Sequence, residues 1–304
     1  EICKRNGWKI ITPDDFDYPD LLRHIPDRPL VLYVDGDITC VKGKVMIGVV
    51  GTRKPCFESV EITRKISGDL AAAGAVVVSG GARGIDCAAH EGALYANGKT
   101  VCVLGCGLGT KYLMENEAMR RDISKNGAVI SEFPPFTPAS RITFPKRNRI
   151  ISGISHALLV VEAGENSGSL ITAKSARSQK RVVFAIPGSV TTSAYTGANR
   201  LLNEGAKAVT SAKEILSPFS DMYPDRLQMN LIGTIKYGEK SKDAPSDIDP
   251  DMVKVYNCLG NEPVHFDDII AATGLSQTKA VMAIMQLEVA ELVIETESKK
   301  YILK

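Results

Sequence analysis

The sequence is poor in residues that could support metal, disulfide or membrane chemistry. Its seven cysteines are scattered, odd in number and contain no Cys-x-x-Cys pair. This argues against a disulfide framework or zinc site and favours a reducing cytoplasm, with Cys102 and Cys106 interpreted as core residues. The histidines have no metal-ligand spacing, so we expect no metal. No apolar run is long enough to span a bilayer, so we expect no membrane partner.

Motifs of phosphate chemistry are also missing. The sequence has neither a Walker A motif nor a spaced Gly-x-Gly-x-x-Gly fingerprint, which argues against ATP hydrolysis and dinucleotide binding. Paired carboxylates and an evident nucleophile with its base are hard to find among the glycine-rich segments. We therefore predict a binding protein without catalytic residues or a cofactor.

Charge divides the chain into three parts. Residues 1–40 carry 5 Lys/Arg and 8 Asp/Glu, a net charge of −3. Residues 41–216 carry 23 and 13, a net charge of +10, and residues 217–304 carry 9 and 14, a net charge of −5. Because an uneven distribution of charge indicates the kind of partner a protein binds, the basic middle part is expected to bind a polyanion.

Short apolar runs alternate with helical stretches from residue 45 onward. The runs lie at 45–50, 75–78, 100–104, 128–130, 158–161 and 182–186, and the helical stretches at 58–73, 86–96, 115–125 and 169–180. Runs without alternation are typical of parallel strands covered on both faces. The sequence therefore predicts an α/β fold with a doubly wound parallel sheet, which is Rossmann-like.

Four segments follow from this pattern. Residues 1–40 are expected to be a lead-in that packs on the Rossmann-like domain of residues 41–216. Residues 217–250 hold several prolines and little periodicity, which favours a linker. Residues 251–304 are interpreted as a small winged-helix domain, with helices at 250–259, 267–272 and 276–292 and a hairpin at 293–303.

A cluster of cations follows Pro145. Pro145 is suited to the first position of a helix, which would place Lys146, Arg147 and Arg149 in its first turn. A helix N-terminus already carries about half a positive charge, so exposed cations there are unfavourable unless an anion binds. The pattern predicts an anion site.

Two glycine-rich turns are further candidates. Gly80, Gly81 and Gly84 could let backbone N–H groups approach a phosphate, and Arg83 could grip its oxygens. For Asp86 we favour a simple helix-capping role.

A second candidate cradle combines Ser167, Gly168, Ser169 and Thr172, although for this turn taken alone we favour plain helix capping by Ser169. Lys174 opens a possible basic stripe with Arg177 and Arg181. Because strand ends meet at one edge, these groups and Arg53 should form one basic rim suited to successive nucleic-acid phosphates, single-stranded or duplex.

Five ordered motifs resemble the DNA processing protein A family, DprA/Smf. They are Val-Val-Gly-Thr-Arg at 49–53, Ser-Gly-Gly-Ala-Arg-Gly-Ile-Asp at 79–86 with Ala-Ala-His-Glu-Gly-Ala-Leu at 88–94, Phe-Pro-Lys-Arg-Asn-Arg-Ile-Ile-Ser-Gly at 144–153, Ser-Gly-Ser-Leu-Ile-Thr-Ala at 167–173, and Gly-Ala-Asn-Arg-Leu-Leu-Asn-Glu-Gly-Ala at 197–206. The resemblance spans residues 8–216, and the C-terminal unit resembles the family's optional third domain.

The resemblance implies a protein with an extended Rossmann domain that binds single-stranded DNA, forms a homodimer and helps to load the RecA recombinase during natural transformation. It implies no catalytic residue. By the family's pattern, DNA contacts would fall on Arg53, on the turn around Gly80, Gly81 and Arg83, and on Lys146, Arg147 and Arg149, with Asn148 holding that helix start. Residues 108–113 depart from the family's Asp and Tyr-Pro pattern, and the family's N-terminal helical domain is not found in this sequence.

Two other expectations remain open. A related class of Rossmann folds, the nucleoside monophosphate phosphoribohydrolases, would need a carboxylate beside a bound ribose, for which Asp86, Glu162 or Glu165 are the local candidates. The winged helix lies in the acidic part of the chain, so we favour a protein-contact or structural role there over duplex binding.

Overall fold

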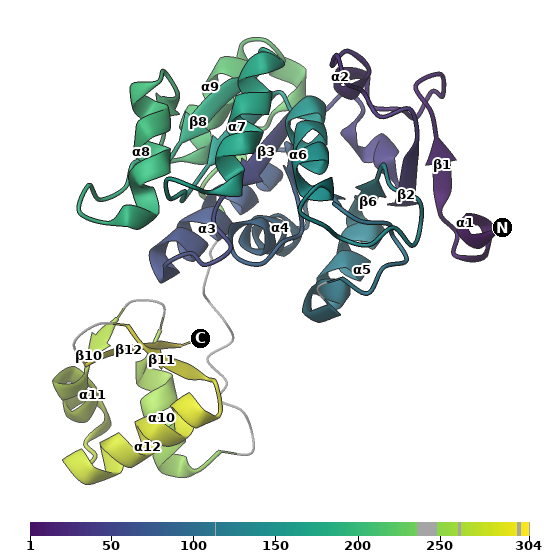
Figure 1. Cartoon of the computed structure of the whole chain (residues 1–304). Coiled ribbons are helices and arrows are strands. Elements are labelled where there is room, and N and C mark those ends of the chain that lie inside the picture. Colours follow the sequence, from purple (N-terminus) through teal and green to yellow (C-terminus); the bar gives the residue numbers. More distant parts are fainter. Residues whose placement is uncertain (113, 236–247, 261–262, 297–298, 304) are drawn as a thin grey trace. The chain divides into compact units, whose positions relative to one another are not determined.

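The computed structural model describes residues 1–112, 114–235, 248–260, 263–296 and 299–303 (Figure 1). The chain divides into two compact units, Glu1–Ile235 and Lys236–Lys304, and each has its own hydrophobic core. Among the described residues, no helix has the length and apolar character needed to cross a membrane.

A sheet of nine described strands forms the centre of the first unit. The strand order is β1-β2-β6-β5-β4-β3-β7-β8-β9, and neighbours from β6 to β9 run parallel. The parallel strands are β3 Met46–Val50, β4 Val76–Ser79, β5 Thr100–Val103, β6 Ala128–Ser131, β7 Ala157–Val160, β8 Val182–Ala185 and β9 Lys207–Ala208. The doubly wound fold is confirmed. Among the described parallel strands, β9 alone lacked a prediction, because this exposed two-residue strand carries no apolar run.

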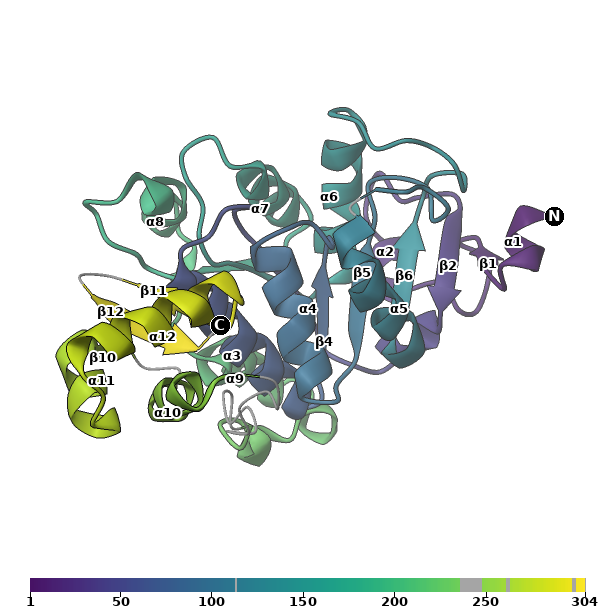
Figure 2. The same cartoon turned by 90° about the horizontal axis from the view of Figure 1, so that it is seen from below.

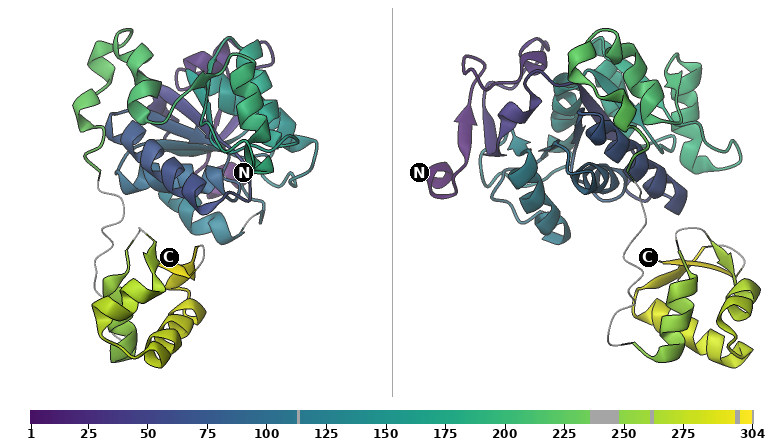
Figure 3. Two further views of the ribbon diagram at one scale, coloured as in Figure 1. Left: turned by 90° about the vertical axis from the view of Figure 1, so that its left-hand side faces the viewer. Right: turned by 180° about the vertical axis from the view of Figure 1, so that it is seen from behind.

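The lead-in adds two strands to the edge of the sheet and also packs on one of its faces through Tyr18, Leu22 and Ile25. After the short helix α1 Ile2–Arg5, β1 Lys9–Ile11 pairs antiparallel with β2 Leu32–Gly36, and β2 pairs antiparallel with β6. Helix α2 Asp20–Arg23 joins the two strands and contacts α6 Thr143–Ile154. Figure 3 shows these N-terminal strands at one edge of the sheet.

Two helical layers cover the sheet (Figure 2). Helices α2, α6, α7 Gly168–Ser178 and α8 Thr196–Asn203 cover one face. The other face is covered by α3 Phe57–Ala72, α4 Ile85–Tyr95, α5 Glu117–Asn126 and α9 Ala212–Ser220. Cys102 and Cys106 are buried in the core with Ile123 of α5, which confirms their packing role.

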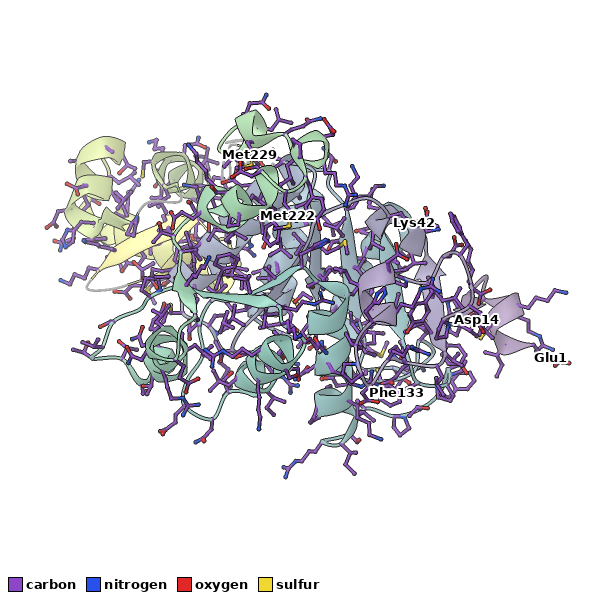
Figure 4. All side chains as sticks on the ribbon, turned by 90° about the horizontal axis from the view of Figure 1, so that it is seen from above. Glu1, Asp14, Lys42, Phe133, Met222 and Met229 are labelled. Atoms are coloured by element: carbon purple, nitrogen blue, oxygen red, sulfur yellow. The ribbon has the colours of Figure 1, made fainter. Side chains whose placement is uncertain are left out.

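The predicted linker needs correction at its beginning. Helix α9 continues through Pro218 to Ser220, and Leu227 is buried against the core of the first unit. The backbone N–H of Gln228 donates to the carbonyl oxygen of Ala73 at 2.9 Å. Met229, labelled in Figure 4, packs against the same core. Residues 217–235 therefore belong to the first unit because Phe219 and Leu227 are buried in its core. Residues 236–247 lie outside the described residues.

The second unit is a winged helix, as predicted. Helices α10 Pro250–Cys258, α11 Phe266–Thr273 and α12 Gln277–Val289 pack around one core. Strands β10 Val264–His265, β12 Lys300–Leu303 and β11 Val293–Glu295 form an antiparallel sheet in that order.

A buried histidine in α4 is held in its neutral form. The hydroxyl of Thr100 donates to the carbonyl oxygen of Val77 at 2.8 Å, so its oxygen accepts from Nδ1–H of His90 at 2.8 Å. The other ring nitrogen, Nε2, is buried and has no hydrogen-bond partner among the residues that the structure describes. Burial lowers the pKa of His90 to about 3, and the charge of Arg147 acts in the same direction.

Acid should therefore destabilise the fold through His90. An unfolded histidine has a pKa near 6.5, so the unfolded chain binds the proton first and stability falls below that pH. Between pH 7.5 and pH 5 this residue should cost about 2 kcal/mol of unfolding free energy. In urea unfolding, His90→Gln should reduce the pH dependence by this amount, whereas His24→Gln at an exposed position should not. Equal pH dependence of all three proteins would contradict the assignment.

Candidate nucleic-acid interface

A cavity of about 640 Å³ opens at the carboxyl ends of β3 and β7, where the strand order reverses. Open α/β sheets bind ligands at this point. Of the predicted site residues, the cavity is lined by Arg53, Arg147, Asn148, Ser167, Gly168, Ser169 and Thr172. Those outside its lining are Gly80, Gly81, Arg83, Gly84, Lys146, Arg149 and Lys174.

The start of α7 faces this cavity. The Oγ of Ser167 accepts from the N–H of Ser169 at 3.4 Å and lies 2.7 Å from the Oγ of Ser169, so Ser167 caps the helix. A Cβ on Gly168 would meet nothing within 4 Å, so no contact within the protein requires glycine there. Asn148 of α6 donates to the carbonyl oxygen of Gly168 at 3.4 Å. Partial positive charge at this open helix start suits an anion.

Helix α6 begins two residues earlier than predicted. Its first residue is Thr143, whose N–H donates to the Oγ of Ser140 at 3.2 Å. Pro145 is therefore the third helical residue, a position that still lacks a helical partner for its N–H. Lys146 and Arg147 consequently lie two residues deeper in the helix than the sequence suggested, and Ser140 was the missed signal for its start.

Arg147 is buried beneath the cavity. Its Nη1 lies 3.8 Å from Oδ2 of Asp86 and donates to the carbonyl oxygen of Val103 at 3.2 Å. A Cβ on Gly80 would lie 1.3 Å from this Nη1, so glycine is required by the guanidinium and not by a phosphate. Burial raises the pKa of Asp86, and Arg147 opposes that shift. The capping interpretation of Asp86 is corrected too, since α4 has Gly84 as its N-cap and Asp86 accepts from the N–H of Ala82.

The remaining glycines of that turn also serve the fold. Gly81 and Gly84 have φ of +64° and +77°, which side chains rarely adopt. A Cβ on Gly84 would lie 2.5 Å from the carbonyl oxygen of Thr52. Arg83 is exposed, but its Nε lies 2.5 Å from a carboxylate oxygen of Glu115. This turn is therefore better explained by packing than as the predicted phosphate cradle.

Arg149 also points away from the cavity. Its guanidinium pairs with Glu132 and, at 3.0 Å, with Asp27 of the lead-in, and its side chain is only 15% exposed. Burial raises the pKa of Glu132, and Arg149 opposes that shift. Arg149 thus joins α6 to the N-terminal segment. No local sequence pattern reveals its partner Asp27, which is distant in the chain.

Three exposed cations stand near the opening. Arg53 and Arg141 line the cavity, and the guanidinium carbon of Arg53 lies 4.9 Å from the ring centre of Phe144. Lys146 is exposed on the adjoining turn of α6. Among the described residues, none of these three cations forms an ion pair. Arg141 was missed because it stands alone before the cation cluster.

The basic stripe predicted along α7 does not form. Arg177 pairs with Glu204 at 2.6 Å. Arg181 turns inward and donates to the carbonyl oxygens of Leu21 and Gly153, both at 3.1 Å. Lys174 alone keeps an exposed position, on a neighbouring hollow of about 450 Å³ that shares Ser167 with the main cavity.

Two of the three carboxylates that a phosphoribohydrolase could use already interact with other groups of the protein. Asp86 is paired with Arg147, and Glu162 is buried and accepts from the N–H of Cys56 at 3.0 Å. Glu165 lines the cavity but is exposed. The enzymatic alternative is therefore not favoured.

The same chain matches two family descriptions. Residues 9–220 match DNA recombination-mediator protein A, and residues 239–296 match the DprA winged helix domain. Protein Smf of Synechocystis is 36% identical over 96% of this chain and 79% of its own length. DNA processing protein DprA of Bacillus subtilis is 39% identical over 70% of this chain and 71% of its own length.

Solved structures agree with these matches. DprA of Streptococcus pneumoniae is 38% identical, with a TM-score of 0.66 over 69% of this chain and 74% of that one. A Helicobacter pylori DprA structure, whose description concerns single-stranded DNA binding, is 28% identical, with a TM-score of 0.64 over 71% and 97%. Five ordered motifs, the extended sheet and these matches lead to one conclusion: the chain belongs to the DNA recombination-mediator protein A family, DprA/Smf.

Proposed function

We propose that this protein binds single-stranded DNA without catalysing a reaction and loads the RecA recombinase onto it in natural transformation. The observation that carries the proposal is a group of exposed cations, Arg53, Arg141 and Lys146, beside the open start of α7, none of which pairs with an acidic group in the described part of the chain. The Helicobacter pylori relative, described as binding single-stranded DNA, supports the same ligand. The RecA step and its biological setting rest on the family resemblance.

The α7 start would receive one phosphate of the DNA backbone. The N–H group of Gly168 and the hydroxyls of Ser167 and Ser169 are suited to phosphate oxygens. Arg53 and Arg141 would hold neighbouring phosphates from the cavity wall. Such interactions are independent of base sequence, so binding should be general and sensitive to salt.

Two cations that are largely buried, Arg147 and Arg149, would hold the α6 side of this interface in position. Arg147 ties α6 to the start of α4 through Asp86, and Arg149 ties it to the lead-in through Asp27 and Glu132. Both would position the α6 start while Lys146 faces solvent. Arg83 and Lys174 would contact only DNA that extends beyond the cavity.

We further propose that the protein works as a homodimer in the cytoplasm. The dimer rests on the family resemblance. The cytoplasmic location is supported by seven cysteines that are all free in the structure, as expected of a reducing compartment.

Charge reversal at the cavity should weaken DNA binding. Arg53→Glu and Lys146→Glu should each lower affinity for a poly-dT oligonucleotide in an anisotropy titration. Removal of one phosphate-neutralising cation should also reduce the slope of log affinity against log salt by about 0.7. Lys65→Glu, an equal charge change at an exposed site on α3, is the control and should bind like wild type. Wild-type affinity of both the Arg53 and the Lys146 variant would overturn the proposed interface.

Two glycine substitutions should separate binding from folding. Gly168→Ala meets open space, so its stability should be unchanged or up to about 1 kcal/mol higher, while its methyl group hinders phosphate approach and lowers affinity. Gly80→Ala collides with Arg147, so it should lower the melting temperature. Thermal unfolding and poly-dT titration measure both properties. Full affinity of Gly168→Ala would argue against phosphate binding at α7.

A further inference from the structure

The second unit exposes apolar side chains along α12. Val281, Met282, Met285 and Val289 have exposed fractions of 40%, 57%, 59% and 86%. Residues 282, 285 and 289 follow the spacing of one helical face, while Ala280, Ala283, Ile284 and Leu287 fill the core behind them. We name the four exposed residues the α12 apolar face. Four adjacent exposed apolar side chains on one helix indicate an interaction surface.

This face is poorly suited to DNA. A winged helix that reads duplex DNA presents polar and basic groups from its recognition helix to base edges and phosphates. The cation of α12, Lys279, lies 3.2 Å from Asp251, which also lies 3.8 Å from Lys254. Residues 236–304 carry 8 Lys/Arg and 12 Asp/Glu, a net charge of −4. Both the apolar face and the negative charge disfavour a polyanion.

Charge also selects among protein partners. Acidic residues of this unit include Glu288 on α12 itself and the exposed Asp267 and Asp268 at the start of α11. A second copy of the unit would bring an equal negative charge to the interface, which is unfavourable. A partner with apolar anchors flanked by cations is complementary in both respects. Methionine side chains adapt readily to such anchors.

We propose that the α12 apolar face docks a basic amphipathic helix of another protein. The helix would place apolar side chains at i, i+3 or i+4 and i+7 against Met282 and Met285, with lysine or arginine on its flanks. Docking at this face of the second unit does not depend on DNA binding at the cavity.

The test uses the full chain and a synthetic helical peptide with leucine on one face and lysine elsewhere. Wild type should bind the labelled peptide in an anisotropy titration and should not bind a matched peptide with glutamate in place of lysine. The double variant Met282→Glu/Met285→Glu should bind the lysine peptide at least about tenfold more weakly, because its α12 face no longer offers apolar anchors. Since this variant is more acidic, attraction by charge alone predicts tighter binding.

Controls make each outcome decisive. Met222→Glu, at an exposed methionine of the first unit, should bind the peptide like wild type. If the double variant melts early, Val289→Glu at the most exposed position replaces it. Equal or tighter peptide binding by the variants would overturn the proposal. The proposal would also be overturned if the wild-type chain self-associates or binds duplex DNA and the α12 substitutions abolish that association or binding. Binding of poly-dT should stay unchanged in every α12 variant.

Discussion

The buried ion pair between Arg147 and Asp86 is the interaction on which the candidate site depends. It joins α6, which covers one face of the sheet, to the start of α4, which covers the other. Gly80 makes room for the guanidinium, and the carbonyl oxygen of Val103 accepts a further hydrogen bond. A buried charge without its partner is strongly unfavourable, so this pair fixes the cavity wall that α6 provides.

Once α6 is fixed, the roles of its cations separate. Arg147 faces the protein interior, Arg149 faces the lead-in, and Lys146 faces solvent. The three cations are neighbours in the sequence but have different roles in the fold. Arg147 and Arg149 form ion pairs that hold α6 in place, and Lys146 is exposed. The positive surface near the cavity comes instead from Arg53, Arg141 and Lys146, gathered from two segments of the chain.

Much of the fold was predictable because buried parallel strands leave continuous apolar runs, as at residues 45–50 and 182–186. A capping turn before α7 was also readable because it is local in sequence, but the cap is Ser167 and not the expected Ser169. The partners of Arg147 and Arg149 were not, since Asp86 and Asp27 are distant in sequence. Nor was the attachment of residues 217–235, where burial of Leu227 outweighs a composition typical of linkers.

The central claim is that the cavity binds the phosphate backbone of single-stranded DNA. The most direct measurement is an anisotropy titration of the wild-type chain with a labelled poly-dT oligonucleotide, alone and annealed to its complement, over a series of salt concentrations. We expect tighter binding of the single strand, with affinity that falls linearly on a log–log plot against salt. Equal or tighter binding of the duplex, or affinity that does not change with salt, would contradict the claim.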